Sequence, residues 1–234
     1  MKLLITTAIA ATLTLTACNT NNAPTGNASL EKFKTLYKTS YDLKDIPTAI
    51  TAVQLILSED STNTLRDSLP SMYLAVQNIE ACYTTTEAAL KRHPEDEEYA
   101  KYKMLCLEQL GKADELFALA KNLYAKTGKA EYMYKIASVQ LVTGEFDAAT
   151  KSINEMMEKY KNTTDSVDIF IDQGQSQRVP IVAACWNMKG YLFIQTQKYQ
   201  KAGEAYQKAI QIFPDFVMAR RNLQQLIQGA QQQR

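Results

Sequence analysis

Apolar and small residues recur between Ala183 and Phe216 at the spacing of two amphipathic helices joined by a short turn. They fall every three or four positions, which is the period of one face of an α-helix. Small residues at regular intervals allow two helices to approach closely, and a proline near position 214 stops the second helix. The residues that carry this pattern are Trp186, Gly190, Phe193, Tyr199, Ala202, Tyr206, Ala209 and Pro214.

The same pattern can be followed back along the chain at a period of about 33 residues, as expected for an array of helix pairs. It is clear from Ala130 to Thr163, where Gly144, Phe146 and Ala149 are among the recurring positions. Three weaker units precede it, at Leu30–Thr62, Asn63–Asp96 and Glu97–Ala130. Pro70 lies within the expected first helix of the second unit, so that helix should start late or kink.

The unit from Ala183 to Phe216 resembles a tetratricopeptide (TPR) repeat. The leucine that usually follows the tryptophan by three residues is replaced here by Lys189. The resemblance implies an all-α fold: a right-handed α-solenoid of about five TPR-like helix pairs, followed by a C-terminal capping helix at Asp215–Gln228 with a polar outer face. It also implies packing roles for Trp186, Gly190, Tyr199, Ala202, Tyr206, Ala209 and Pro214, and in the fourth unit for Gly144, Phe146 and Ala149.

About twenty residues interrupt the period between the fourth and fifth units. Val167 to Ile171 has the character of a β-strand, and the polar stretch after it is predicted to be a loop. Such an insertion could form part of a binding site, or its apolar residues could fill the gap between the two units.

The N-terminus carries the signature of a processing signal. One lysine precedes an uncharged apolar stretch, Leu3 to Leu15, that is too short to span a bilayer. It ends in Leu15-Thr16-Ala17-Cys18, which resembles a bacterial lipobox and implies that Cys18 is lipidated, for example with palmitate. The predicted organisation is a signal peptide at 1–17, a flexible tether at 18–29, repeat units at 30–163, an insertion at 164–182, and the last unit with the capping helix at 183–234.

Composition and charge narrow the function classes. Glycine and proline number eight and six, too few turn formers for a many-stranded β protein. The chain has 26 basic and 25 acidic residues, and removal of the signal peptide takes away one lysine and no acid. A neutral mature surface argues against nucleic acid as a partner, and leaves the lipid as the expected contact with the membrane.

The sequence shows no constellation for catalysis, metal binding or a cofactor. His93 is the only histidine and precedes a proline at a predicted helix end, where capping is the expected role. We therefore expect no catalytic residue, no metal site and no cofactor. Cys82, Cys106 and Cys185 fall on positions that take small residues and should be buried thiols, although a Cys82–Cys106 disulfide is conceivable.

If the chain forms such an array, the first helix of each unit lines a concave wall that binds an extended peptide or a partner helix. The expected wall residues mix aromatic, aliphatic and polar side chains, which suits a partly polar peptide. They are Lys101, Leu105 and Glu108 in the third unit, Tyr134, Ser138 and Leu141 in the fourth, Asn187, Tyr191 and Ile194 in the fifth, and Arg221 in the capping helix.

Two functional hypotheses follow. The first is a non-catalytic, membrane-anchored adaptor or assembly factor of the bacterial cell envelope, most simply at the outer membrane facing the periplasm, because Asn19 rather than aspartate follows Cys18. The second is a lipoprotein that captures peptides or glycans for an envelope transporter, with Tyr134, Trp186 and Tyr191 as stacking surfaces.

Overall fold

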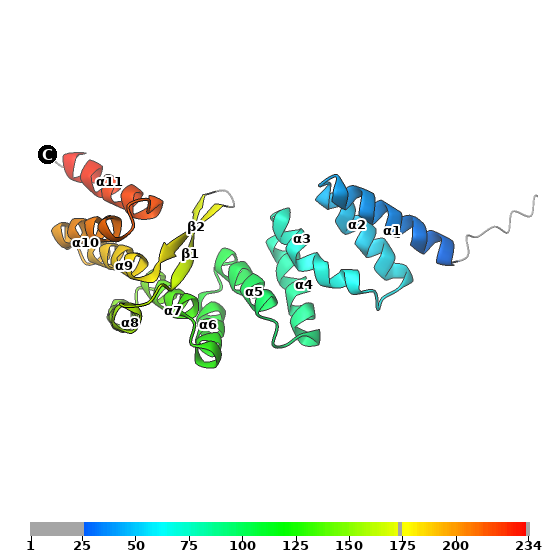
Figure 1. Ribbon diagram of the computed structural model, residues 1–234, viewed down its shortest axis with the longest axis horizontal. Helices are drawn as coiled ribbons and strands as arrows, with labels where there is room; N and C mark the ends of the chain where they lie inside the picture. Colours follow the sequence, from blue (N-terminus) through cyan, green and yellow to red (C-terminus); the bar gives the residue numbers. More distant parts are fainter. Residues whose placement is uncertain (1–25, 173–174, 233–234) are drawn as a thin grey trace, which may run out of the picture. The chain divides into compact units, whose positions relative to one another are not determined.

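The computed structural model describes residues 26–172 and 175–232, which form α-helices, one 3-10 helix and a β-hairpin (Figure 1). The predicted signal peptide, Cys18 and most of the predicted tether lie outside the described residues. Within the described ranges, none of the helices combines the length and the apolar character needed to cross a membrane.

The chain divides into two compact units, one ending at Val76 and one beginning at Gln77. The first contains α1 (Gly26–Asp42), α2 (Ile46–Glu59), the 3-10 helix η1 (Thr64–Ser68) and α3 (Leu69–Ala75). Helix α1 begins inside the segment predicted to be a tether, so residues 26–29 are helical instead. Asparagine and serine are poor in helix interiors but suit a first turn, where backbone N–H groups need no acceptor within the helix.

Pro70 has the effect predicted for it. Helix α3 begins at Leu69 with the proline in its first turn, and η1 occupies the preceding residues. The shortened helix buries Leu69 and Met72 with Ala49, Ile50 and Val53 of α2 in one core. The predicted second repeat, Asn63–Asp96, thus contributes α3 to the first compact unit and its following helix to the second.

The second compact unit contains a first helix, three helix pairs, a hairpin and the closing helix (Figure 1). Its elements are α4 (Ile79–Arg92), α5 (Glu97–Gln109), α6 (Ala113–Thr127), α7 (Ala130–Val142), α8 (Phe146–Tyr160), β1 (Ser166–Asp172), β2 (Gln175–Pro180), α9 (Ile181–Gln195), α10 (Tyr199–Ile212) and α11 (Val217–Gln232). The predicted pairs α5/α6, α7/α8 and α9/α10 are present, and the capping helix is α11.

A repeated backbone turn joins the two helices of a pair. Gly111, Gly144 and Gln197 occupy the left-handed region with φ of 68°, 80° and 58°, each two residues past the end of a first helix. In each case the next residue donates a hydrogen bond five residues back, such as Lys198 N to Phe193 O at 2.8 Å. Such closures satisfy the last carbonyls of the helix. The turn therefore recurs with the repeat, whether or not the position is glycine.

Helices α9 and α10 meet at Gly190. A Cβ atom placed on this glycine would overlap the ring of Tyr206, a side chain that is only 2% exposed. Ala202 and Ala209 of α10 are completely buried beside the same pair. The small residues that marked the repeat in the sequence thus lie where the helices approach closely, and the tyrosine fills the space that the missing side chain leaves.

The insertion forms an antiparallel hairpin in which Val167 pairs with Val179 and Ile169 with Gln177. Val167, Ile169 and Val179 are 2%, 8% and 0% exposed and join the core of α7 to α10. The stretch after the first strand was predicted to be a loop, and β2 corrects this from Gln175 onward. The polar sequence of β2 gave no sign of a strand. A strand with one solvated face can form with a single buried valine and backbone pairing to β1.

Gly190→Ala should destabilise the second compact unit by about 1–3 kcal/mol, because the added methyl group forces Tyr206 out of its packed position. Thermal or urea unfolding followed by circular dichroism measures this. The matched control is Gly203→Ala in α10, where the nearest atom to an added Cβ is 3.6 Å away, an ordinary contact. That variant should be neutral or more stable, since alanine favours a helix interior; equal stability of both variants would contradict the close approach at Gly190.

Candidate partner-binding surface

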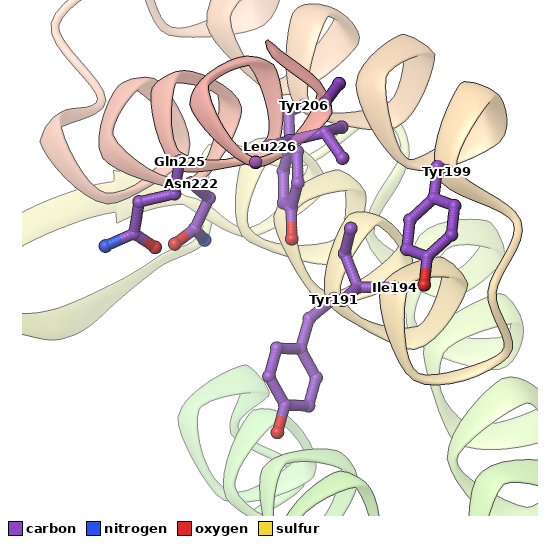
Figure 2. A pocket seen from close by; sticks show the side chains of 9 residues that line it. Tyr191, Ile194, Tyr199, Tyr206, Asn222, Gln225 and Leu226 are labelled. Atoms are coloured by element: carbon purple, nitrogen blue, oxygen red, sulfur yellow. The ribbon is translucent and has the colours of Figure 1, made fainter. Parts of the chain in front are cut away.

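A hollow of about 420 Å³ lies between α9, α10 and α11. Figure 2 shows Tyr191 and Ile194 contributed by α9, Tyr199 and Tyr206 by α10, and Asn222 and Gln225 projecting from α11. The complete lining is Tyr191, Ile194, Tyr199, Tyr206, Asn222, Gln225, Leu226, Gly229 and Ala230. Three tyrosine rings with two amides and two aliphatic side chains are the composition of a site that grips an apolar group and hydrogen-bonds its polar surroundings.

None of the nine lining residues carries a charge at neutral pH. Burial raises the pKa of the Tyr206 hydroxyl to about 12, and the neighbouring Tyr191 acts in the same direction. The Tyr206 hydroxyl therefore stays protonated and neutral around pH 7 and can donate a hydrogen bond. The hollow suits an uncharged segment or side chain and offers no ionic grip.

The structure places two of the predicted wall residues, Tyr191 and Ile194, in this hollow. Two others are corrected. Leu141 is 6% exposed and belongs to the core, and Asn187 is 8% exposed, with its side-chain oxygen accepting a hydrogen bond from Asn222 Nδ2 at 2.9 Å. Neighbouring elements of the fold cover both side chains. Asn187 therefore positions Asn222 through this hydrogen bond and does not itself face a partner.

Lys101 and Glu108 on α5 are exposed, but each is paired with α7. Lys101 Nζ lies 3.2 Å from Glu131, and Glu108 accepts from Lys135 Nζ at 2.8 Å. These pairs join neighbouring repeats, so the two predicted wall residues hold the array together as well as facing solvent. Exposed pairs of this kind contribute up to about 1 kcal/mol each.

Leu105, Tyr134 and Ser138 are half-buried and do not line the hollow. Tyr134 packs against the core, and burial is the main reason why the pKa of its hydroxyl lies well above the ordinary value. The predicted stacking set of Tyr134, Trp186 and Tyr191 is therefore not gathered in this hollow, because Tyr191 alone lines it.

Arg221 on α11 fastens the hairpin to the closing helix. Its Nη1 donates to the carbonyl of Ile171 at 3.3 Å. From β2, the Gln177 amide donates to Asp215 O at 2.6 Å and accepts from Val217 N at 3.0 Å. The hairpin thus positions the start of α11. Arg221, which was predicted to contact a partner, instead forms a hydrogen bond within the fold.

About half of the predicted packing residues are buried: Ala149, Gly190, Ala202, Tyr206 and Ala209. Phe146 and Trp186 are half-buried, whereas the turn residues Gly144 and Pro214 are exposed. Tyr199 is 54% exposed and lies at the rim of the hollow. It begins α10, where one side of the helix end is open to solvent.

Five further lining residues belong to α11 and were not predicted as site residues: Asn222, Gln225, Leu226, Gly229 and Ala230. The spacing of four and three between Asn222, Leu226 and Gly229 is that of one face of a helix.

A second hollow of about 440 Å³ lies among α6, α7 and α8, lined by Phe117, Lys121, Tyr124, Ala125, Met133, Ile136, Gln140, Ala148, Lys151, Ser152 and Glu155. Gln140 is 7% exposed, and its side-chain oxygen has no hydrogen-bond donor among the described residues. This lining carries charges of both signs, in contrast to the first hollow.

Cys82, Cys106 and Cys185 are buried free thiols, as the repeat pattern predicted. Burial raises the pKa of the Cys106 thiol to about 12, and a hydrogen bond with Cys82 acts in the same direction. Burial also raises the pKa of the Cys185 thiol to about 12. Cys106 and Cys185 are therefore protonated near neutral pH and poorly nucleophilic.

Comparison with known proteins assigns the repeat. Residues 183–216 match the family model of the tetratricopeptide repeat. The fold of this chain is a tetratricopeptide-repeat fold. The matched segment covers most of α9, all of α10 and the turn to α11, and it contributes the three tyrosines and Ile194 of the hollow.

Solved structures with this fold support the assignment. A tetratricopeptide repeat protein from Parabacteroides merdae superposes with a TM-score of 0.63 at 11% identity, covering 85% of this chain and 72% of that one. YrrB, described as a TPR protein with an unusual peptide-binding site, gives 0.55 at 15% identity and covers 83% and 95%. MamA from Desulfovibrio magneticus gives 0.56 at 8% identity and covers 81% and 97%. No significant match was found among curated protein sequences.

The Glu97 ion pair between α5 and α7 should make stability depend on pH. Its carboxylate accepts from Lys129 Nζ at 2.5 Å and from the Tyr132 hydroxyl at 2.6 Å, and these bonds hold its pKa below the ordinary 4.5. The stabilisation is present above that ordinary value and is lost as pH falls through the lowered pKa. Glu97→Gln should therefore lose less stability than the wild type between about pH 5 and 3. Urea unfolding across this range tests it, with Glu204→Gln as an exposed control; parallel curves would contradict the pairing.

Proposed function

We propose that this chain is a non-catalytic adaptor that binds an extended segment of a protein partner at the tyrosine-lined hollow of α9, α10 and α11. The observation that carries the proposal is an uncharged hollow whose rim exposes Tyr191 and Tyr199, 39% and 54% accessible. Tyrosine provides large contact area with little entropy to lose, and it is enriched where proteins bind other proteins.

The shape of the site supports an anchor with a polar flank. A hollow of about 420 Å³ accommodates one or two apolar side chains. Asn222 and Gln225 at its α11 edge each offer a donor and an acceptor, which is what the backbone of an extended peptide requires. The similar fold of YrrB, a protein described by its peptide-binding site, is consistent with such a ligand.

We further propose that this adaptor belongs to the bacterial cell envelope, where a lipid on Cys18 anchors it to the outer membrane facing the periplasm. Its support is the order of features in the first eighteen residues: a positive charge, an apolar stretch, small residues and a cysteine. A lipid anchor with two or three acyl chains holds a protein to a bilayer durably, at about 0.8 kcal/mol per buried CH₂.

The pocket's neutrality also admits the second hypothesis, capture of a peptide or glycan for delivery to a transporter, because tyrosine rings stack on sugars as well. A thermal-shift screen with neutral peptides and oligosaccharides separates the two ligands. Stabilisation by free oligosaccharide would favour capture, whereas stabilisation by apolar-anchored peptides alone would favour the adaptor.

Replacing both rim tyrosines, Tyr191→Ala with Tyr199→Ala, should weaken partner binding by about tenfold or more, as expected for the loss of central aromatic contacts. The partner is first identified by pull-down from envelope extract, and its affinity is then measured by isothermal titration calorimetry. The matched control is Tyr41→Ala, which removes a 43% exposed tyrosine from α1, outside the site. Unchanged affinity in the double variant, with its melting temperature preserved, would place the partner elsewhere.

Cys18→Ala should leave the protein without lipid, because the thiol that accepts the acyl group is gone. The variant should move from the detergent phase to the aqueous phase, and the mass of its N-terminus should lack the acyl chains. Cys82→Ala serves as the control, since that cysteine is completely buried and should not affect partitioning. Equal partitioning of wild type and Cys18→Ala would refute the anchor without touching the proposed binding site.

A further inference from the structure

Two lysines converge on the single tryptophan of the chain. Lys189, one turn beyond Trp186 on α9, has its Nζ 5.1 Å from the ring centroid, and Lys208 on α10 has its Nζ 4.4 Å from the same centroid. The two ammonium nitrogens therefore lie less than about 10 Å apart, within the screening length of 0.1 M salt. Like charges so placed repel, and the negative face of the indole offsets part of this repulsion.

Neither ammonium group has an acidic partner among the described residues. Several lysines elsewhere in the second compact unit do have such partners, among them Lys101 with Glu131, Lys103 with Glu87 and Lys135 with Glu108. No carboxylate in the described ranges approaches Lys189 or Lys208 within the 4.0 Å of an ion pair. The repulsion between two neighbouring positive charges costs free energy, and a bound anion would remove that cost.

The position of Lys189 makes the arrangement unusual for a packed helix pair. The side chain is half-buried, next to the fully buried Cys185 and Met188, at the place where the repeat pattern has leucine. Burial lowers the pKa of its ammonium group, and the charge of Lys208 acts in the same direction. An aliphatic residue here would avoid both costs, so stability does not account for the lysine.

We propose that Lys189 and Lys208, both close to the ring of Trp186, form a binding site for the carboxylate of an acidic side chain on a protein partner. This inference rests on the proposed function as far as the source of the carboxylate is concerned. The chemistry of the site does not depend on the proposed function. Two ammonium groups can donate to a carboxylate, no acid of the described residues lies within ion-pair distance of them, and the indole ring can pack against the methylene groups of an aspartate or glutamate. The tyrosine-lined hollow offers apolar contacts and hydrogen bonds to uncharged groups, and the lysine pair adds an ionic contact.

Trp186 itself reports on occupancy, since it is the only tryptophan. In the full mature chain in detergent, an acetylated and amidated tri-glutamate peptide should change the tryptophan fluorescence saturably, and added salt should weaken the effect. A tri-glutamine peptide of the same length should bind at least about tenfold more weakly, as expected for loss of charge-assisted hydrogen bonds. Equal titrations with the two peptides would overturn the proposal, as would inorganic phosphate binding where tri-glutamate does not.

Two variants separate binding from folding. Lys189→Leu should abolish the response to tri-glutamate while the melting temperature stays equal or rises, because an aliphatic side chain suits the half-buried position. Lys208→Gln, at an exposed position, should weaken the response without a change in folding, and Lys201→Gln on the same helix is the control. A retained response in Lys189→Leu would overturn the site. If the lysine variants lose the response to tri-glutamate but pull-down from envelope extract finds no protein partner, the carboxylate site is supported and the proposed function is contradicted.

Discussion

The contact between Gly190 and Tyr206 is the constraint on which the functional end of this protein depends. Because Gly190 has no side chain, α9 and α10 can pack with the tyrosine ring against the glycine backbone. The same ring forms part of the floor of the hollow beside α11. One close helix approach therefore sets both the geometry of the repeat and the depth of the candidate site, and a change at the first must disturb the second.

The hairpin extends this arrangement by a different kind of packing. A helix pair cannot bury its apolar face alone, and the twenty residues between α8 and α9 interrupt the stacking that would bury it. Val167, Ile169 and Val179 restore that burial from one face of the hairpin. Gln177 and Arg221 then tie the strands to α11. The apolar residues of the insertion are accounted for by packing, and its solvated face remains available to a partner.

The two candidate contact regions on α9 and α10 differ in their physics. In the hollow, tyrosine and amide groups without charge favour an apolar anchor whose polar neighbours form ordinary hydrogen bonds. Around Trp186, two unpaired ammonium groups favour a carboxylate, and attraction of this kind acts at longer range and guides association. A partner segment that carries both an apolar and an acidic side chain could therefore contact both regions at once.

The sequence by itself determined the class of fold, because the features concerned are local. Gly190, Ala202 and Ala209 at fixed intervals predict close helix pairs, Pro70 predicts where α3 begins, and period and turn spacing predict the number of elements. The strand β2 was missed, since its polar residues carry no periodicity strong enough to outweigh a loop.

What the tertiary structure decided was which side chains meet. Leu141, Asn187 and Tyr134 have the phase of wall residues, yet burial depends on the elements that cover them, and the first two are covered. The hollow draws on α9, α10 and α11, so its members are up to about forty positions apart in sequence and share no motif. The pairing of Lys189 with Lys208 is likewise invisible along the chain, because the proximity of two like charges follows from the distance between two packed helices, which only folding sets.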